Sequence, residues 1–219
     1  MSSFPGFQKE AYAFLLNLSL ENNKAFFTAH RTDYEQLVLN PLRALAADLE
    51  PLMLSINGAF DTRPVVGGAL SRIHRDTRFS RDKSPYRDHM WLEYKNKAED
   101  AAKLCFYFSF SPRGLSCGLG LYAATAAEMK QFRGHAMLGA ARFSALHENL
   151  LARGFAFHGP PYKRPPATHT NPAVNALLAV KTFHYGRDIP MDMAAVPAFS
   201  QYLTDQFTAL TELYRFFNQ

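Results

Sequence analysis

The chain has 219 residues, 47% of them hydrophobic and 14% aromatic, with a formal net charge of +5. This composition supplies one buried core but too short a chain for two comfortable domains, so we expect a single domain over residues 1–219. No apolar run approaches the ~20 residues that span a bilayer, and the chain start lacks the pattern of a secretory signal, so we expect a soluble, cytoplasmic protein.

The first third of the chain has helical periodicity. Apolar residues recur every three to four positions and predict a first helix that ends near residue 20. Asn22 or Asn23 can cap a second helix, whose apolar face would consist of Phe27, His30, Tyr34 and Leu37. The pair Asn40-Pro41 predicts the cap and first turn of a third helix, and Asn57 predicts its end.

Residues 71–87, which read SRIHRDTRFSRDKSPYR, carry most of the excess charge. Six cations and two carboxylates give this segment a net charge of +4, and five of the cations are arginines, whose planar guanidinium suits phosphate or carboxylate. Apolar residues are interleaved with the cations, and Lys-Ser-Pro-Tyr is typical of a shaped turn. We therefore predict a fixed turn that presents cations to an anion. The alternative is a solvated surface of internal ion pairs with Asp76 and Asp82.

The middle of the chain predicts antiparallel β structure. Residues 90–94 read as a strand, and apolar residues alternate with small or polar ones on both sides of a turn at 111–114. This pattern predicts a hairpin of residues 104–110 and 115–121.

The hairpin register has two consequences. Cys105 would lie opposite Gly120 and Cys117 opposite Phe108, which keeps the thiols ~10 Å apart and predicts that both are reduced. Gly118 and Gly120 would share one face and leave a shallow trough, which a packed helix or a ligand could occupy.

Helices return after the hairpin. The sequence predicts a capping box at Thr125 to Glu128, a helix that ends at Gly154, an irregular proline-rich connection at 160–166, a cap at Asn171-Pro172, a short strand at 182–185 and a final helix at 199–217. Strands clustered between helical blocks, without β–α–β alternation, indicate an α+β fold. We expect an antiparallel sheet in the middle of the chain, covered by N- and C-terminal helices.

Several familiar sites are missing from the sequence. It contains no glycine-rich phosphate loop, no Gly-x-Ser-x-Gly elbow and no Cys-x-x-Cys pair, and it indicates no particular cofactor. The eight histidines are scattered without a His-x-x-x-His pair, so we expect no metal site. His74 and Asp76 could nevertheless share a metal from one strand edge. His30 is interpreted as a hydrogen-bonded residue at the edge of an apolar face, with a role toward a ligand as the alternative.

Three segments resemble a known family. Residues 22–35 read NNKAFFTAHRTDYE, residues 71–86 read SRIHRDTRFSRDKSPY, and residues 118–122 read GLGLY. Together they resemble the uncharacterised family called domain of unknown function 2461, over most of the chain. The resemblance implies a single-domain protein with no established activity, and it carries over, without assigned roles, Asn23, Arg31, Tyr34, Arg72, Arg75, Asp76, Arg78, Lys83, Tyr86 and Arg133. The chain departs from the family pattern at residues 163–166 and 170–172.

The basic segment provides the leading functional hypothesis. We expect it to sit at the edge of the sheet and to line a cleft that recognises a small phosphate- or carboxylate-bearing ligand. The binding residues would be Arg31, Tyr34, Arg72, Arg75, Arg78, Lys83, Tyr86 and, from the family resemblance, Arg133. If the ligand is transformed, Asp76 or His74 would transfer the proton.

Two other functions fit the same residues. A nucleic-acid-binding protein would place the cations on phosphates and use Phe79 or Tyr86 for stacking. A structural or partner-binding module would use the ion pairs internally. One compact basic block fits a pocket better than an extended nucleic-acid track, so the small anion is the expected partner. The orientation of the arginines, toward a cavity or over an open surface, distinguishes the two.

Overall fold

The α+β prediction is confirmed. The computed structural model describes residues 3–96, 104–121 and 124–218, and its centre is a five-stranded antiparallel sheet in the order β1-β2-β3-β5-β4. The strands are β1 (Met90–Tyr94), β2 (Leu104–Ser111), β3 (Gly114–Leu121), β4 (Ala156–His158) and β5 (His184–Ile189). The predicted hairpin is β2 and β3. The short strand expected at 182–185 starts later and continues to Ile189, and the sequence pattern did not indicate β4.

Helices lie on both sides of the hairpin in the chain. They are α1 (Lys9–Leu20), α2 (Lys24–Ala29), α3 (Arg31–Asp33), α4 (Asn40–Ile56), α5 (Ala126–Leu138), α6 (Ala140–Ala152), α7 (Pro172–Leu178) and α8 (Phe199–Phe217). Three predicted caps are confirmed: the Asn23 side chain accepts from an amide of α2, Thr125 and Glu128 form a capping box on α5, and Asn171 caps α7. No helix in these described ranges is long and apolar enough to cross a membrane.

The prediction that Asn40 caps a helix is wrong. The chain is already helical before it, because α3 runs through a π-helical turn (Tyr34–Leu39) directly into α4. Pro41 lacks an amide hydrogen and would leave one carbonyl of a regular α-helix without its donor. A π turn immediately before the proline shifts the hydrogen-bonding pattern at that point, so the helix continues.

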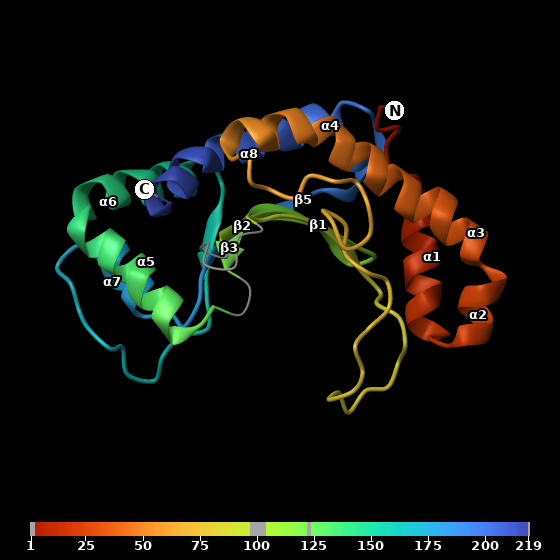
Figure 1. Cartoon of the computed structure of the whole chain (residues 1–219), viewed down its shortest axis with the longest axis horizontal. Coiled ribbons are helices and arrows are strands. Elements are labelled where there is room, and N and C mark those ends of the chain that lie inside the picture. The colour runs from red at the N-terminus through yellow and green to blue at the C-terminus, as the bar shows by residue number, and fades with distance from the viewer. Residues whose placement is uncertain (1–2, 97–103, 122–123, 219) are drawn as a thin grey trace.

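Two helices cover one face of the sheet. Figure 1 shows α4 and α8 lying across it. The Tyr94 hydroxyl donates to the Ala46 carbonyl of α4, and the Phe106 ring packs edge-on against Phe207 of α8 at 5.5 Å between centroids. These aromatic contacts lie in the core between the sheet and the two helices.

The opposite face of the sheet carries no described helix. In Figure 1, α1, α2 and α3 stand beyond the β1 edge and α5, α6 and α7 beyond the β4 edge, so that the two groups flank this face like the sides of an arch. Because the side chains of a strand alternate between the two faces of a sheet, every other residue of each strand points to this open face.

The predicted hairpin register is confirmed. Cys105 pairs with Gly120 and Phe108 with Cys117. Both thiols are free and buried, and burial raises the pKa of each to about 12. A thiol with such a pKa is not a nucleophile at neutral pH.

Backbone and side-chain atoms of the adjacent strands occupy the space beside the two glycines. A Cβ at Gly118 would overlap the Tyr185 carbonyl oxygen, and a Cβ at Gly120 would overlap the Cβ of His184. The Tyr107 hydroxyl also lies 2.8 Å from the position of a Cβ at Gly118. Among the residues that the structure describes, the glycines are therefore approached by the adjacent strands β5 and β2 of the same sheet.

We expect Gly120→Val to lower the free energy of unfolding by about 1–3 kcal/mol, because the added methyl groups must displace β5. Urea denaturation measures the change. Gly58→Val is the matched control, since no atom lies within 4 Å of a Cβ at that position. Equal stabilities of the two variants would contradict the close approach of β3 and β5.

Candidate functional site

The basic segment, residues 71–87, forms an arm whose two antiparallel sides are joined by an isolated β-bridge between His74 and Tyr86. It starts along β1, where the Ser71 amide donates to the Trp91 carbonyl at 3.0 Å. Two further backbone hydrogen bonds join its sides, from Arg75 to Pro85 at 2.9 Å and from Arg87 to Ile73 at 2.8 Å. Figure 1 shows the arm extending from the β1 edge of the sheet, away from the layer of α4 and α8.

The base of the arm is held by the connection between α1 and α2 and by α2 itself. The Asn22 side chain donates to the Tyr86 carbonyl and accepts from the Tyr86 amide, both at 2.9 Å. The Tyr86 ring, only 5% exposed, stacks on Phe27 at 4.2 Å between centroids. His74 contacts both rings. Tyr86 and His74 therefore fix the arm to the body.

Much of the charge on the arm is paired within it. Arg78 donates to Asp76 at 2.6 Å, Arg75 donates to Asp82 at 2.5 Å, and Lys83 donates to the Thr77 carbonyl at 2.9 Å. The hydrogen bonds from Arg78 lower the pKa of Asp76 to about 2. A carboxylate with this pKa is a weak base at neutral pH, which disfavours proton transfer by Asp76.

Other side chains of the arm face solvent. Phe79, near the tip, is 95% exposed, and the Arg78 guanidinium lies 5.8 Å from its ring centroid. Arg72 and Arg81 are exposed and form no ion pair with any described residue. Arg87 lies over the Trp91 ring at 4.9 Å, beside the open face of the sheet.

The remaining predicted binding residues do not join the arm cations. Arg31 is exposed and pairs with Glu35 at 3.0 Å on its own helical segment. Tyr34 is buried, and burial raises its pKa to about 12. Arg133 is 8% exposed on α5 and donates to the Val180 carbonyl at 2.7 Å. His30 stacks on Phe26 and contacts its carbonyl oxygen, in agreement with the structural interpretation.

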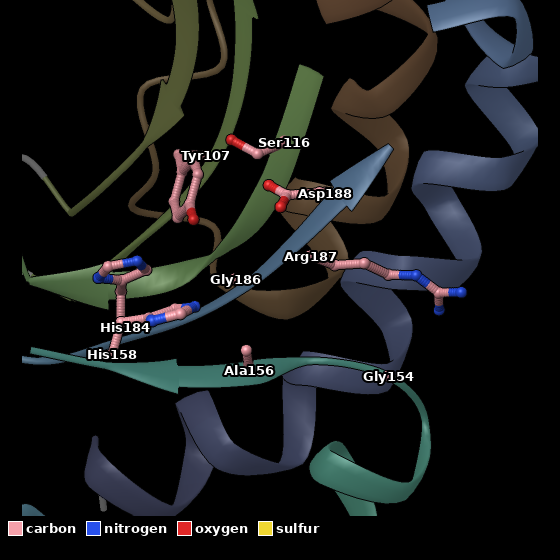
Figure 2. A pocket seen from close by; sticks show the side chains of 9 residues that line it. All are labelled: Tyr107, Ser116, Gly154, Ala156, His158, His184, Gly186, Arg187 and Asp188. Atoms are coloured by element: carbon pink, nitrogen blue, oxygen red, sulfur yellow. The ribbon is translucent and has the colours of Figure 1, made fainter. Parts of the chain in front are cut away.

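A separate hollow of about 450 Å³ lies on the open face of the sheet, over β3, β5 and β4. Figure 2 shows its lining, which consists of Tyr107, Ser116, Gly154, Ala156, His158, His184, Gly186, Arg187 and Asp188. None of the predicted site residues contributes to it. Its volume falls within the range of small-molecule sites.

Two histidines form one end of the hollow. His158 and His184 pair directly across β4 and β5, with ring centroids 5.0 Å apart. Burial, together with the neighbouring His158, lowers the pKa of His184. The Tyr107 ring meets His184 edge-on at 6.3 Å, and burial raises the pKa of its hydroxyl. The imidazole of His184 and the phenol are thus both neutral at pH 7.

Sequence reasoning missed this hollow because its residues are dispersed between positions 107 and 188. The nearest signal was the pair of glycines in β3, which predicted a shallow trough on this face, although neither glycine lines the hollow. The three-residue strand β4 is too short to produce a recognisable alternation. No group of three or more histidine, cysteine or acidic side chains in the described parts of the chain is positioned to hold a metal.

A family model described as conserved hypothetical protein (DUF2461) matches residues 10–216, nearly the whole chain. No curated protein and no solved structure matches the chain.

We expect Asn22→Ala to loosen the arm, because it leaves the Tyr86 amide and carbonyl without partners at a cost of about 1–3 kcal/mol. Limited trypsin digestion should then cut within residues 75–83 faster than in the wild type. Asn40→Ala is the control, since the exposed Asn40 side chain accepts its one side-chain hydrogen bond among the described residues from the nearby Arg43. Equal cleavage rates would contradict the role of Asn22.

The lowered pKa of His184 predicts a pH dependence of stability. In the unfolded chain the imidazole takes up its proton near pH 6.5, whereas in the folded chain it does so at lower pH. The stabilisation is complete above about pH 6.5 and is lost as the pH falls through the folded-state pKa. NMR titration of the His184 ring proton should give a midpoint below 6.5, and His184→Gln should reduce the acid loss of stability. A midpoint at or above 6.5 would disagree with burial of this ring.

Proposed function

We propose that this chain, which belongs to the DUF2461 family of conserved hypothetical proteins, binds single-stranded nucleic acid through its arm. The observation that carries the proposal is the display of the arm cations. They lie along the anchored arm, which carries an exposed phenylalanine near its tip, and none lines the hollow on the sheet. Cations spread along an arm can contact successive phosphates of a nucleic acid, whereas a single small anion would need them to converge on one point.

The exposed ring of Phe79 favours a single strand over a duplex. A phenylalanine 95% exposed has few contacts with the protein to lose when it stacks on a base, and every unpaired base offers a face for stacking. The adjacent Arg78 guanidinium can hold a phosphate next to that base. Cations and an aromatic ring in alternation are the usual elements of single-strand recognition.

The internal ion pairs of the arm are compatible with this function. Exposed ion pairs contribute little to stability because water competes for both partners. A phosphate can therefore replace Asp76 as the partner of Arg78, while Arg72 and Arg81 have no carboxylate to give up among the described residues. The two carboxylates hold the arm in shape when no ligand is bound.

The small-anion hypothesis stays a prediction, and one observation weighs against it. An enclosed anion needs several cations aimed at one cavity. The hollow has a single arginine, Arg187, whose guanidinium is occupied by the Arg153 carbonyl and by Gln206. Figure 2 shows its side chain pointing away from the other lining residues.

Fluorescence anisotropy with labelled oligothymidylate of about 20 nucleotides tests the proposal. We expect a Kd of roughly 10⁻⁴ to 10⁻⁶ M at physiological salt, falling steeply as salt is reduced. Arg72→Ala with Arg81→Ala should lower the slope of log K against log salt by about 1.4, since each phosphate contact contributes about 0.7. Phe79→Ala should weaken binding by about 1–3 kcal/mol at unchanged slope.

The control is Arg43→Ala with Arg215→Ala, which removes the same charge from the helical layer of α4 and α8. Equal effects of the two double variants would mean that binding follows net charge alone. Two other results would replace the proposal. Phosphate-dependent thermal stabilisation lost in Arg78→Ala would favour the small anion, and sedimentation with phosphatidylserine vesicles without oligonucleotide binding would favour a lipid surface.

A further inference from the structure

Three polar groups in the hollow have no partner within the described protein. The Tyr107 hydroxyl, the Ser116 hydroxyl and the Asp188 carboxylate form no hydrogen bond or ion pair there, although the chain carries an excess of cations. Ser116 and Asp188 pair directly across β3 and β5, so their side chains share the open face. The arm differs in this respect, because both of its carboxylates are bonded to arginines.

Aromatic rings lie beside these groups. Figure 2 shows Tyr107 and the two imidazoles of His158 and His184 together on one side of the lining, with Asp188 on the other side of Tyr107. Gly118 and Gly186 pair directly across β3 and β5, and the Tyr107 hydroxyl lies 2.8 Å from the position of a Cβ at either one. Any larger residue would push the phenol out of this place. The glycines therefore keep the ring over the floor.

The charge of the hollow is opposite to that of the chain. Asp188 is the one acidic residue of its lining, and the guanidinium of Arg187 is directed away. His184 is held neutral by its burial beside His158. The hollow is thus a negative, aromatic-walled site on a protein with a net charge of +5.

We propose that the hollow binds an organic ammonium group, the chemistry shared by small primary amines and by lysine side chains. Asp188 neutralises the ammonium charge and accepts one of its N–H donors, and Ser116 accepts a second. The Tyr107 ring offers its negative face to the cation. A neutral His184 accepts a further N–H. Anions are excluded by Asp188. This site is independent of the arm and of nucleic-acid binding.

NMR titration of the histidine ring protons tests the proposal. The resonances of His158 and His184, assigned with the His158→Gln and His184→Gln variants, should shift saturably with putrescine and remain unchanged with the neutral isostere 1,4-butanediol and with inorganic phosphate. Asp188→Asn should weaken putrescine binding by about tenfold, since the amide oxygen can still accept a hydrogen bond but the charge that strengthens it is lost. Asp33→Asn, which neutralises an exposed carboxylate on α3, should have no effect.

The probes also distinguish the two sources of the ammonium group. Tighter binding of Nα-acetyl-lysine methylamide than of putrescine would identify a lysine side chain of another protein, and the reverse a free amine; either result supports the site. The proposal is overturned if neither amine shifts these resonances up to about 20 mM, where even a millimolar Kd gives near-saturation. Equal shifts with butanediol, or undiminished affinity in Asp188→Asn, would also overturn it.

Discussion

The one-sided burial of β2 determines the architecture of this protein. Phe106, Phe108 and Phe110 lie on the covered face of the sheet and are fully buried, against Phe207, Phe199 and Phe7 respectively, whereas the residues between them face the other way. Each buried ring contributes about 1.5–3 kcal/mol, and a shift of one residue would expose all three together. The register is therefore fixed, and with it the identity of the face that stays open. Both candidate sites depend on this choice, since the hollow lies on the open face and the arm leaves the sheet at its β1 edge.

Features encoded by neighbouring residues could be predicted from the sequence. The register of the β2–β3 hairpin follows from alternation on both sides of a four-residue turn, and the cap at Asn23 needs only the amides just after it. The prediction of a cap at Asn40 was wrong because it considered only Asn40 and Pro41 and not the chain before them. Asparagine before proline favours a helix start only when the preceding chain is not already helical, and the π turn keeps it helical.

Features that depend on distant pairing could not be predicted. The charge of the arm is visible in the sequence, but its direction is set by Asn22, which lies 64 residues before Tyr86. The hollow also depends on a contact between distant residues, because His158 meets His184 only when the three-residue strand β4 pairs with β5. Such contacts are selected by tertiary packing, for which a single sequence carries no local signal. The sequence therefore predicted an anionic partner for the arm, which stays a proposal, and did not indicate the hollow.

The strand pairs beneath the hollow have a consequence for how the chain folds. The hairpin closes a short loop, whereas joining Ser116 to Asp188 brings together residues from opposite sides of three helices. Contacts between such distant positions carry a larger loop-closure cost, so they are expected to form after the hairpin and α8 have built a surface for β5 to dock on. A chain whose synthesis stopped before β5 would contain the arm and the helices α1 to α7 but not the hollow. The two sites would thus mature at different stages of synthesis.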